Sequence, residues 1–513
     1  MIVHEVPQQA WITFFIKRPV ISLVYVLLLL ASVIFIFPRL ETGFLPEMDE
    51  GSIVLDYKSP PGTSLEETDL ILKQVEKIIL QIPEVETYSR RTGTQMGFFI
   101  TEPNDGDYLI QLKKNRKRTT EEVIDDIRVR VEASQPALQI DFGQVIGDML
   151  GDLMESVQPI EVKIFGADRK ELEILSEKVA GIVESIPGTA DVFDGKTIAG
   201  PYMKVEPNAQ RLAQYGITPA NFQSQVQLLL EGAVAGTVTD KDRLTDIRII
   251  YPGNNHVSVS DIGRLNLFLQ NGKLLPISSL ANIQLVPGDA EIQRENLQNI
   301  GLVTARLNGR DLGSVMTVLK SKIKHQIALK QGYSITFGGA YQEQQKSFSE
   351  LLMILVSAIL LVFCVIMALF REYRIACMIL FVAILGIAGS YIALFITGTP
   401  LNVGSYTGLI MIVGIIGENA IFTFLQFREQ LEKSDLDEAI VYAISTRLRP
   451  KLMTALGAII ALMPMALALG TGTEMHQPLA IAIVGGFLVA LPLLLVVLPT
   501  LIRLTYRKKG PHQ

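Results

Sequence analysis

Hydrophobic residues gather in six long runs along this chain, and one very long polar stretch separates the first run from the other five. The first run, Val20–Phe37, follows a short basic segment, and the others lie between Ser349 and Leu504. A bilayer core about 30 Å thick needs about 20 apolar residues per helix. The pattern therefore predicts six membrane helices, at 20–37, 350–370, 375–396, 403–425, 452–470 and 478–502.

Lysine and arginine residues assign the sides of the membrane. They precede the first run, separate the second from the third and the fourth from the fifth, and follow the sixth: Lys17, Arg18, Arg371, Arg374, Arg428, Lys433, Arg447, Arg449, Lys451, Arg503, Arg507, Lys508 and Lys509. The opposite loops, 397–400 and 471–477, contain neither residue type. The positive-inside rule predicts a cytoplasmic N-terminus (1–19), a cytoplasmic tail (503–513) and an exported central domain. We expect the first run to be an uncleaved signal anchor.

The overall composition fits a protein that is partly membrane and partly soluble, since 49% of residues are hydrophobic and the mean hydropathy is +0.34. The net charge of −6 gives no reason to expect a nucleic-acid partner. The two cysteines, Cys364 and Cys377, both fall in predicted spans, so the exported domain is expected to lack disulfides.

The exported domain contains a duplicated pattern of strand, helix, strand, strand, helix and strand. The first copy runs from Ser52 to Phe142, and its helices begin at Ser64 and Thr119, each followed three residues later by a glutamate as in a capping box. The second copy begins at Ile160. In both copies an Ile-Pro pair, at 82–83 and 186–187, separates the first helix from the second strand, which indicates a duplication.

The second copy is interrupted at about 200–292 and resumes near Ile300. The inserted segment contains Asn271-Gly272 between two short apolar strands, which predicts a hairpin with a two-residue turn. The predicted fold is an α/β membrane protein. Six membrane helices in a one-plus-five order carry an α+β domain of two ferredoxin-like βαβ repeats with an inserted subdomain. The predicted bounds are 45–145 for the first repeat, 157–200 with 293–345 for the second, 200–292 for the insert and 350–502 for the later spans.

Four short phrases, in order, carry a family resemblance over almost the whole chain. They are FIKRP at 15–19, GFLPEMDEG at 43–51, GLIMIVG at 408–414 and RLRPKLMT at 447–454. With the one-plus-five topology, the chain resembles the C-terminal half of a resistance-nodulation-division (RND) efflux permease, of the hydrophobic/amphiphilic or heavy-metal type.

The resemblance implies a secondary active transporter of the bacterial inner membrane, with no enzymatic activity and no cofactor. Permeases of this family contain two such halves and form trimers, and proton entry drives export through a periplasmic adaptor (membrane fusion protein) and an outer-membrane channel. The repeats would be porter subdomains, and the insert would be part of the funnel or docking domain. The aspartate pair that couples protons lies in the half that is not present here. We therefore expect a complementary N-terminal-half chain, assembly with itself, or a fragment of a longer permease.

Glu418 is the main candidate for chemistry in the membrane. It lies ten residues before Arg428, so it is about 15 Å from the cytoplasmic end of its helix, near the middle of the bilayer. Drug exporters of the family usually have a lysine at this place, whereas some metal exporters have a glutamate. A carboxylate at this depth indicates a proton-relay or ion-pair site that includes the neighbouring Asn419, or else a neutral carboxyl that helps helices to pack.

Arg447 and Thr454 match a family motif in which an arginine and a threonine approach the proton site. They are seven residues apart and share a helix face if the helix continues through Pro450. The alternative for Arg447 is a simple cytoplasmic anchor.

The sequence gives a less specific signal for residues that contact the substrate. A loop of the first repeat carries Met96, Phe98 and Phe99, at the place of a substrate-gating loop in drug exporters, although these side chains could equally pack into their own domain. Copper and silver exporters of the family use methionines at places that hold Asp56, Asp105 and Gly151 here. Soft cations need sulfur ligands, so a copper exporter is disfavoured, and the scattered histidines form no metal motif.

Three functions remain open from the sequence. The first is a proton-driven efflux subunit that forms half of a split permease. The second is a membrane scaffold or binding module that does not transport and docks an adaptor through the insert. The third is an auxiliary protein of the secretion machinery, which shares the six-span plan.

Overall fold

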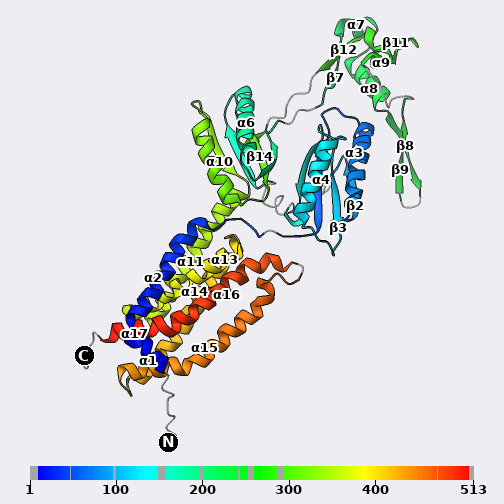
Figure 1. Cartoon of the computed structure of the whole chain (residues 1–513). Helices are drawn as coiled ribbons and strands as arrows, with labels where there is room; N and C mark the ends of the chain where they lie inside the picture. The colour runs from blue at the N-terminus through cyan, green and yellow to red at the C-terminus, as the bar shows by residue number, and fades with distance from the viewer. Residues whose placement is uncertain are drawn as a thin grey trace.

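The computed structural model describes residues 10–46, 48–95, 100–147, 149, 158–196, 200–240, 243–251, 259–269, 271–286, 293–470 and 472–507. A helical bundle forms one end of the molecule, two α+β units lie above it, and the inserted segment lies at the far end (Figure 1). The first and last described helices, α1 (Ala10–Lys17) and α17 (Leu498–Arg507), lie at the opposite end of the bundle from the α+β units.

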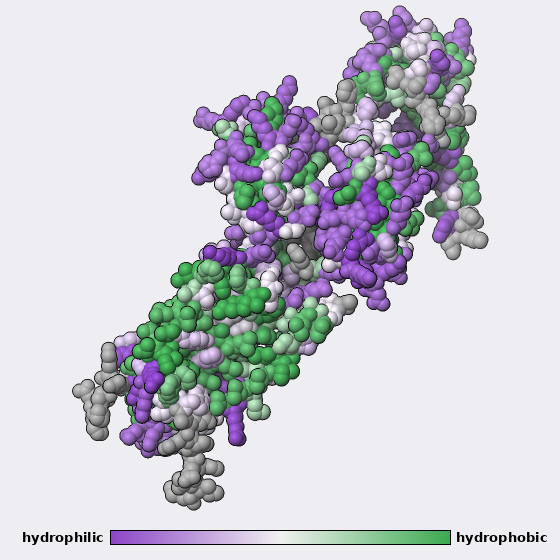
Figure 2. Space-filling view, in the orientation of Figure 1, coloured by the Kyte–Doolittle hydropathy of each residue, from purple (hydrophilic) through white to green (hydrophobic). Residues whose placement is uncertain are grey.

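Six helical stretches in the described residues are long and apolar enough to cross a membrane, judged by length and composition. They are Pro19–Arg39, Ala340–Phe370, Tyr373–Thr397, Val403–Leu431, Leu436–Ala466 and Thr473–Tyr506. The visible surface of the bundle is largely hydrophobic, in contrast to the polar surface of the α+β units (Figure 2). Most of the apolar surface of α11 (Ala340–Phe370) is unburied in this chain, so lipid or another chain must cover it.

The helices extend further into the segment between the predicted fourth and fifth spans than the hydrophobic runs do. Helix α14 extends over Val403–Leu431 and helix α15 over Leu436–Ala466, so only residues 432–435 separate them. Helix α15 continues through Pro450, because a proline removes one hydrogen bond of a helix without always ending it. Hydropathy marks where a helix enters lipid and not where it ends, and Arg447, Arg449 and Lys451 therefore lie inside a helix.

The first α+β unit is a four-stranded antiparallel sheet with strand order β2-β3-β1-β4. Its elements are β1 (Ser52–Lys58), α3 (Leu65–Leu80), β2 (Val85–Thr92), β3 (Asp105–Leu112), α4 (Thr120–Ser134) and β4 (Gln139–Gly143). Both predicted helix starts are confirmed. The Ser64 hydroxyl accepts a hydrogen bond from the backbone N–H of Glu67, and Thr119 forms a reciprocal capping box with Glu122. Apolar residues of both helices and of one sheet face form a separate core.

The second α+β unit arranges its strands in the corresponding order, with β6 and β13 on β14, then β5 and β15. Its elements are β5 (Ile160–Phe165), α6 (Arg169–Glu184), β6 (Thr189–Phe193), β13 (Arg294–Glu295), β14 (Gln298–Leu307), α10 (Leu312–Gln326) and β15 (Ser334–Gly338). The last strand leads directly into α11 at Ala340, so this unit continues into the membrane bundle.

The inserted segment forms its own small core. It comprises β7 (Tyr202–Pro207), α7 (Ala209–Gln214), α8 (Pro219–Leu230), β8 (Ala233–Asp240), β9 (Arg243–Ile249), α9 (Val259–Arg264), β10 (Asn266–Phe268), β11 (Leu274–Pro276) and β12 (Ala281–Val286). Strands β10 and β11 pair antiparallel on either side of Asn271-Gly272, which confirms a hairpin there. The predicted two-residue turn is wrong, because Phe268 is paired with Leu274 and the N–H of Leu269 donates to the carbonyl of Lys273, which leaves three residues in the turn. Strands β7 and β12, which enter and leave the segment, pair with each other.

Two arginine–aspartate pairs join the α+β units. Arg306 on β14 donates to both carboxylate oxygens of Asp141 on β4. Arg128 on α4 donates to both oxygens of Asp191 at the β6 end of the other unit, at 3.0 Å each. Bidentate pairs of this kind fix orientation as well as distance.

We expect Arg306→Gln to lower the free energy of unfolding by about 1–3 kcal/mol, because two hydrogen bonds to a charged group are lost. The exchanged pair Asp141→Arg/Arg306→Asp should recover part of that loss. The measurement is unfolding of the full chain in lipid nanodiscs. Arg130→Gln is the matched control, since it breaks an i,i+4 pair with Asp126 within α4 and should change stability by less than about 0.5 kcal/mol. Equal losses for the two variants would contradict a special role for the pairs between units.

Candidate functional site

A cavity of about 560 Å³ opens between α14, α15 and the helix α16 (Gln477–Pro492). Its polar lining comes from α14 and α15: Glu418, Asn419, Arg447, Lys451 and Thr454. Its apolar lining includes Met411, Ile415, Phe422, Leu462, Ile483 and Phe487. The cavity therefore brings together the four residues that the sequence nominated for a proton relay, with one addition.

Glu418 and Asn419 lie in the second half of α14. The carboxylate of Glu418 faces the cavity and is exposed in this chain, whereas Asn419 is half-buried and donates a hydrogen bond to the carbonyl of Ile415, at 3.0 Å. Among the described residues, no ion pair within 4 Å links Glu418 to Arg447 or Lys451.

Arg447 and Thr454 share one face of α15 because the helix runs unbroken through Pro450. The guanidinium of Arg447 lies 5.3 Å from the ring centre of Phe422, in a cation–π arrangement with α14. The Thr454 hydroxyl donates to the carbonyl of Pro450 at 2.9 Å, one turn back along the same helix. Arg447 therefore lies within a helix, and whether it is a cytoplasmic anchor or part of a relay stays a prediction.

Lys451 is the residue that the sequence interpretation missed. Only 4% of it is exposed, and in the described part of the chain its Nζ has no hydrogen-bond partner. It was expected in a cytoplasmic loop, yet it lies between Asn419 and Phe487 in the bundle. The available signal was spacing, since 447, 451 and 454 follow the i, i+4, i+7 rule for one helix face.

The cavity holds more positive than negative charge. Arg447 and Lys451 contribute two basic side chains, and Glu418 contributes one acidic side chain. A charge inside a bilayer is costly unless it is paired, hydrated or neutralised. Basic side chains therefore outnumber acidic ones in the described lining of the cavity.

The predicted substrate contacts Met96, Phe98 and Phe99 lie outside the described residues. Asp56, on β1, and Asp105, on β3, lie on the sheet face away from the helices, and the Asp105 carboxylate is 3.3 Å from the Nζ of Lys58. Gly151 is likewise outside the described residues. Within the part of the chain that the structure describes, no group of three or more His, Cys, Asp or Glu residues is placed to hold a metal ion.

Six membrane-type helices, three of which line a cavity with charged residues, are joined to two α+β units and define a multi-pass membrane protein. The chain belongs to the AcrB/AcrD/AcrF family of RND permeases, whose family model matches residues 9–505. It is accordingly a protein of the bacterial inner membrane.

The chain is similar to metal-resistance proteins. It is 32% identical to the cobalt-zinc-cadmium resistance protein CzcA of Cupriavidus metallidurans, over 92% of this chain and 45% of that protein. It is 28% identical to the nickel and cobalt resistance protein CnrA of the same organism, over 97% of this chain and 48% of CnrA. A crystal structure of a heavy metal efflux pump matches with a TM-score of 0.85 and 26% identity, over 98% of this chain and 52% of that one. The chain thus spans about half the length of the relatives it matches.

We expect Lys451→Met to keep or raise stability, by up to about 1–4 kcal/mol, because it removes an unpaired buried charge in exchange for an apolar side chain of similar length. The same variant should lose transport if the cation belongs to the site. Thermal unfolding is measured on this chain alone, and transport is measured on the native complex. Arg449→Met, two residues earlier and exposed, is the control and should change neither. A loss of stability in Lys451→Met would show that the lysine is a structural ion-pair partner instead.

Proposed function

We propose that this chain is half of a proton-driven RND permease that exports divalent transition-metal cations. The observation that supports this most is the cavity, which gathers Glu418, Asn419, Arg447 and Thr454 from two helices. Proton entry would protonate Glu418, weaken its attraction to Arg447 and Lys451, and so change the packing of α14 against α15.

The excess positive charge supports a two-part site. Lys451 and Arg447 need an acceptor, and Glu418 alone cannot neutralise both. The family resemblance supplies one, because the other half of such permeases carries paired aspartates. We propose that a complementary half, as a separate chain or as the rest of a longer protein, places carboxylates against this cavity.

The remaining architecture follows from the same proposal. The six spans would take the one-plus-five topology with the α+β units in the periplasm, and these units would be ferredoxin-like porter repeats. The matching strand orders β2-β3-β1-β4 and β6-β14-β5-β15 support the duplication. The insert would meet an adaptor and an outer-membrane channel in a trimeric assembly.

Carboxylates in the porter favour a hard or borderline cation as cargo. Asp56 and Asp105 replace the methionines of copper exporters, and oxygen ligands suit Zn²⁺, Co²⁺ or Ni²⁺ better than Cu⁺. The names of CzcA and CnrA, which refer to cobalt, zinc, cadmium and nickel, agree with this choice. A third ligand would have to come from outside the described residues.

Replacing Glu418 tests the relay. Glu418→Gln keeps shape but cannot release a proton, so we expect Zn²⁺ export and coupled proton uptake by the native complex in proteoliposomes to fall to background. Glu429→Gln, in the exposed last turns of the same helix, should behave as the wild type. Export at the wild-type rate in Glu418→Gln would exclude the relay. No export by any form of the assembled complex would favour a scaffold.

The carboxyl of Asp105 allows a pH test of cargo binding. Burial raises the pKa of Asp105, although Lys58 opposes the shift, so a proton competes with a cation at milder acidity than for an ordinary aspartate. We expect Zn²⁺ affinity of the full chain, measured by titration calorimetry, to fall between about pH 7 and about pH 5. Asp105→Asn should lower affinity at least about ten-fold at the higher pH and lose most of the pH dependence. Glu132→Gln, on an exposed part of α4, is the control. An unchanged affinity in Asp105→Asn would remove this residue from the cargo path.

A further inference from the structure

The linker that follows the first membrane helix contacts both the membrane bundle and the two α+β units. This linker, residues 41–46 and 48–51, is called the strap below. It connects η1 (Phe37–Arg39), at the end of the first span, to β1 at the start of the first unit. In sequence it is the first unit's direct connection to a membrane helix, whereas the second unit continues into α11.

The lower end of the strap is attached to the start of the helix that carries Glu418. Thr42 forms a parallel β-bridge with Leu401, in the loop between α13 (Ile387–Thr397) and α14. The N–H of Leu401 donates to the carbonyl of Glu41 at 2.7 Å, and the N–H of Gly43 donates to the carbonyl of Leu401 at 3.2 Å. Leu401 lies directly before Asn402, the N-cap of α14. A shift of this helix end therefore pulls on Thr42.

Thr42 is also seated on the second unit. Its N–H donates to the carboxylate of Asp311, the N-cap of α10, at 3.3 Å, and its carbonyl accepts from the N–H of Gly313, also at 3.3 Å. The backbones approach so closely that a Cβ on Gly313 would overlap the Thr42 hydroxyl oxygen and lie 3.3 Å from its Cβ. One residue of the strap thus joins α14 to α10.

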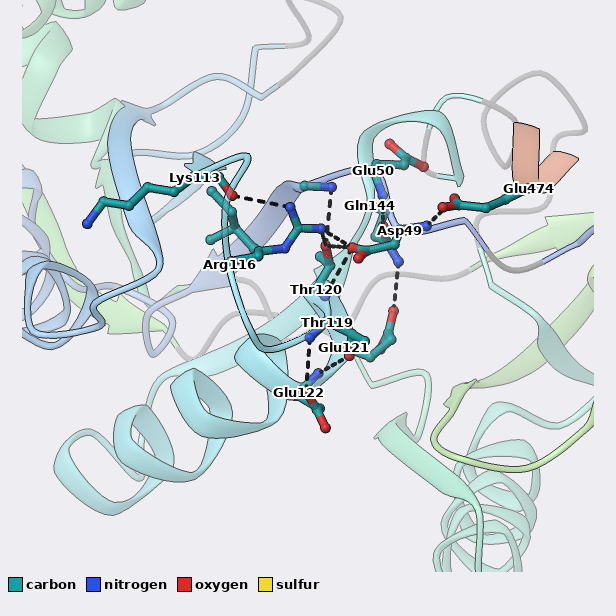
Figure 3. Close-up of polar contacts among 12 residues, drawn as sticks. Asp49, Glu50, Lys113, Arg116, Thr119, Thr120, Glu121, Glu122, Gln144 and Glu474 are labelled. Carbon is teal, nitrogen blue, oxygen red and sulfur yellow. Dashed lines mark hydrogen bonds and ion pairs between the residues drawn. The ribbon is translucent and has the colours of Figure 1, made fainter. Parts of the chain in front are cut away.

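The other end of the strap contacts the first unit and the turn that precedes α16 (Figure 3). The Asp49 carboxylate accepts from the N–H of Thr120, at 3.1 Å, and from the Thr120 hydroxyl and Arg116, at the N-terminus of α4. The N–H of Asp49 donates to the carboxylate of Glu474, at 3.0 Å, in the turn η3 (Thr473–His476) that leads into α16. Asp49 thus joins α16 to α4.

The charge of Asp49 is secured by these contacts. Burial alone would raise its pKa, but the hydrogen bonds from Thr120 and Arg116 outweigh burial and hold the pKa below the ordinary value. A carboxylate at a helix N-terminus is also stabilised by the helix dipole. The attachment to α4 therefore persists at every physiological pH.

We propose that the strap transmits movements of the helices that line the membrane cavity to the α+β units. Thr42 transmits them to the second unit, and Asp49 transmits them to the first. The inference rests on the proposed transport function, since it supplies the reason for α14 and α16 to move. The helices it attaches to, α14 and α16, are two of the three that line the cavity. Each attachment is local, so the two outputs can be separated by mutation.

Gly313→Ala tests the link to the second unit. Alanine normally stabilises a helix relative to glycine, so any loss arises from displacement of Thr42 and not from a weaker α10. In proteoliposomes that contain the native complex, with Zn²⁺ as the probe, we expect Zn²⁺ exported per proton taken up to fall about five-fold or more. Thr42→Ala/Gly313→Ala removes the overlapping hydroxyl and should restore the ratio. Thr317→Ala, exposed on the same helix, is the control.

Hydrogen exchange of the same samples reports whether the contact is lost. Gly313→Ala should raise exchange in the first turn of α10, and Asp49→Asn should do so in the first turn of α4; each should leave the other helix unchanged. Gly313→Val repeats the test with a larger side chain if alanine leaves exchange unaltered. A normal export ratio in a variant whose contact is lost would overturn the strap. Wild-type transport in Glu418→Gln would overturn the proposed function instead, so the two failures are distinct.

Discussion

The cost of holding charge inside an apolar bundle is the constraint on which this structure depends. Lys451 is almost completely buried and has no acceptor among the described residues, and Glu418 shares its cavity. Such groups are tolerated in a membrane only where protein or water surrounds them, so the three helices cannot close completely. Helix α16 packs tightly on α14 near one end of the cavity, where a Cβ on Gly408 would lie 2.8 Å from that of Ala482. The helices separate further along, beside Glu418.

The bundle thus has a tightly packed end and an end with a cavity, and this division gives the strap attachments outside the bundle a structural role. The tight contact holds the outer ends of α14 and α16 together, and both strap attachments lie just beyond those ends. A small displacement of α14 at Glu418 therefore acts on two tightly packed helix ends and not on a flexible loop. Packed helices shift between discrete arrangements more readily than they deform, so a movement of α14 or α16 can be passed on as a rigid displacement.

Much of the fold could be predicted because it depends on local patterns. The caps at Ser64 and Thr119 and the Asn271-Gly272 hairpin are short-range signals, and each is found where the sequence placed it. The four residues nominated for the relay also meet in one cavity. Lys451 was misplaced because hydropathy locates lipid and not helix ends. The pairs Arg128–Asp191 and Thr42–Asp311 could not be predicted, because they join residues far apart in the chain and depend on how whole units dock. Met96, Phe98 and Phe99 remain predictions.

The insertion within the second α+β unit affects the order in which the parts of the chain can fold. Strand β5 must pair with β14, and the entire insert lies between them in sequence, whereas the first unit is continuous. Closing such a long loop costs entropy and delays pairing. During synthesis the first unit can pair its strands as soon as β4 has emerged, whereas β5 can pair with β14 only after the insert has emerged. The insert, with β7 and β12 already joined at its base, brings those distant strands together and so serves as a folding aid for the unit that it interrupts.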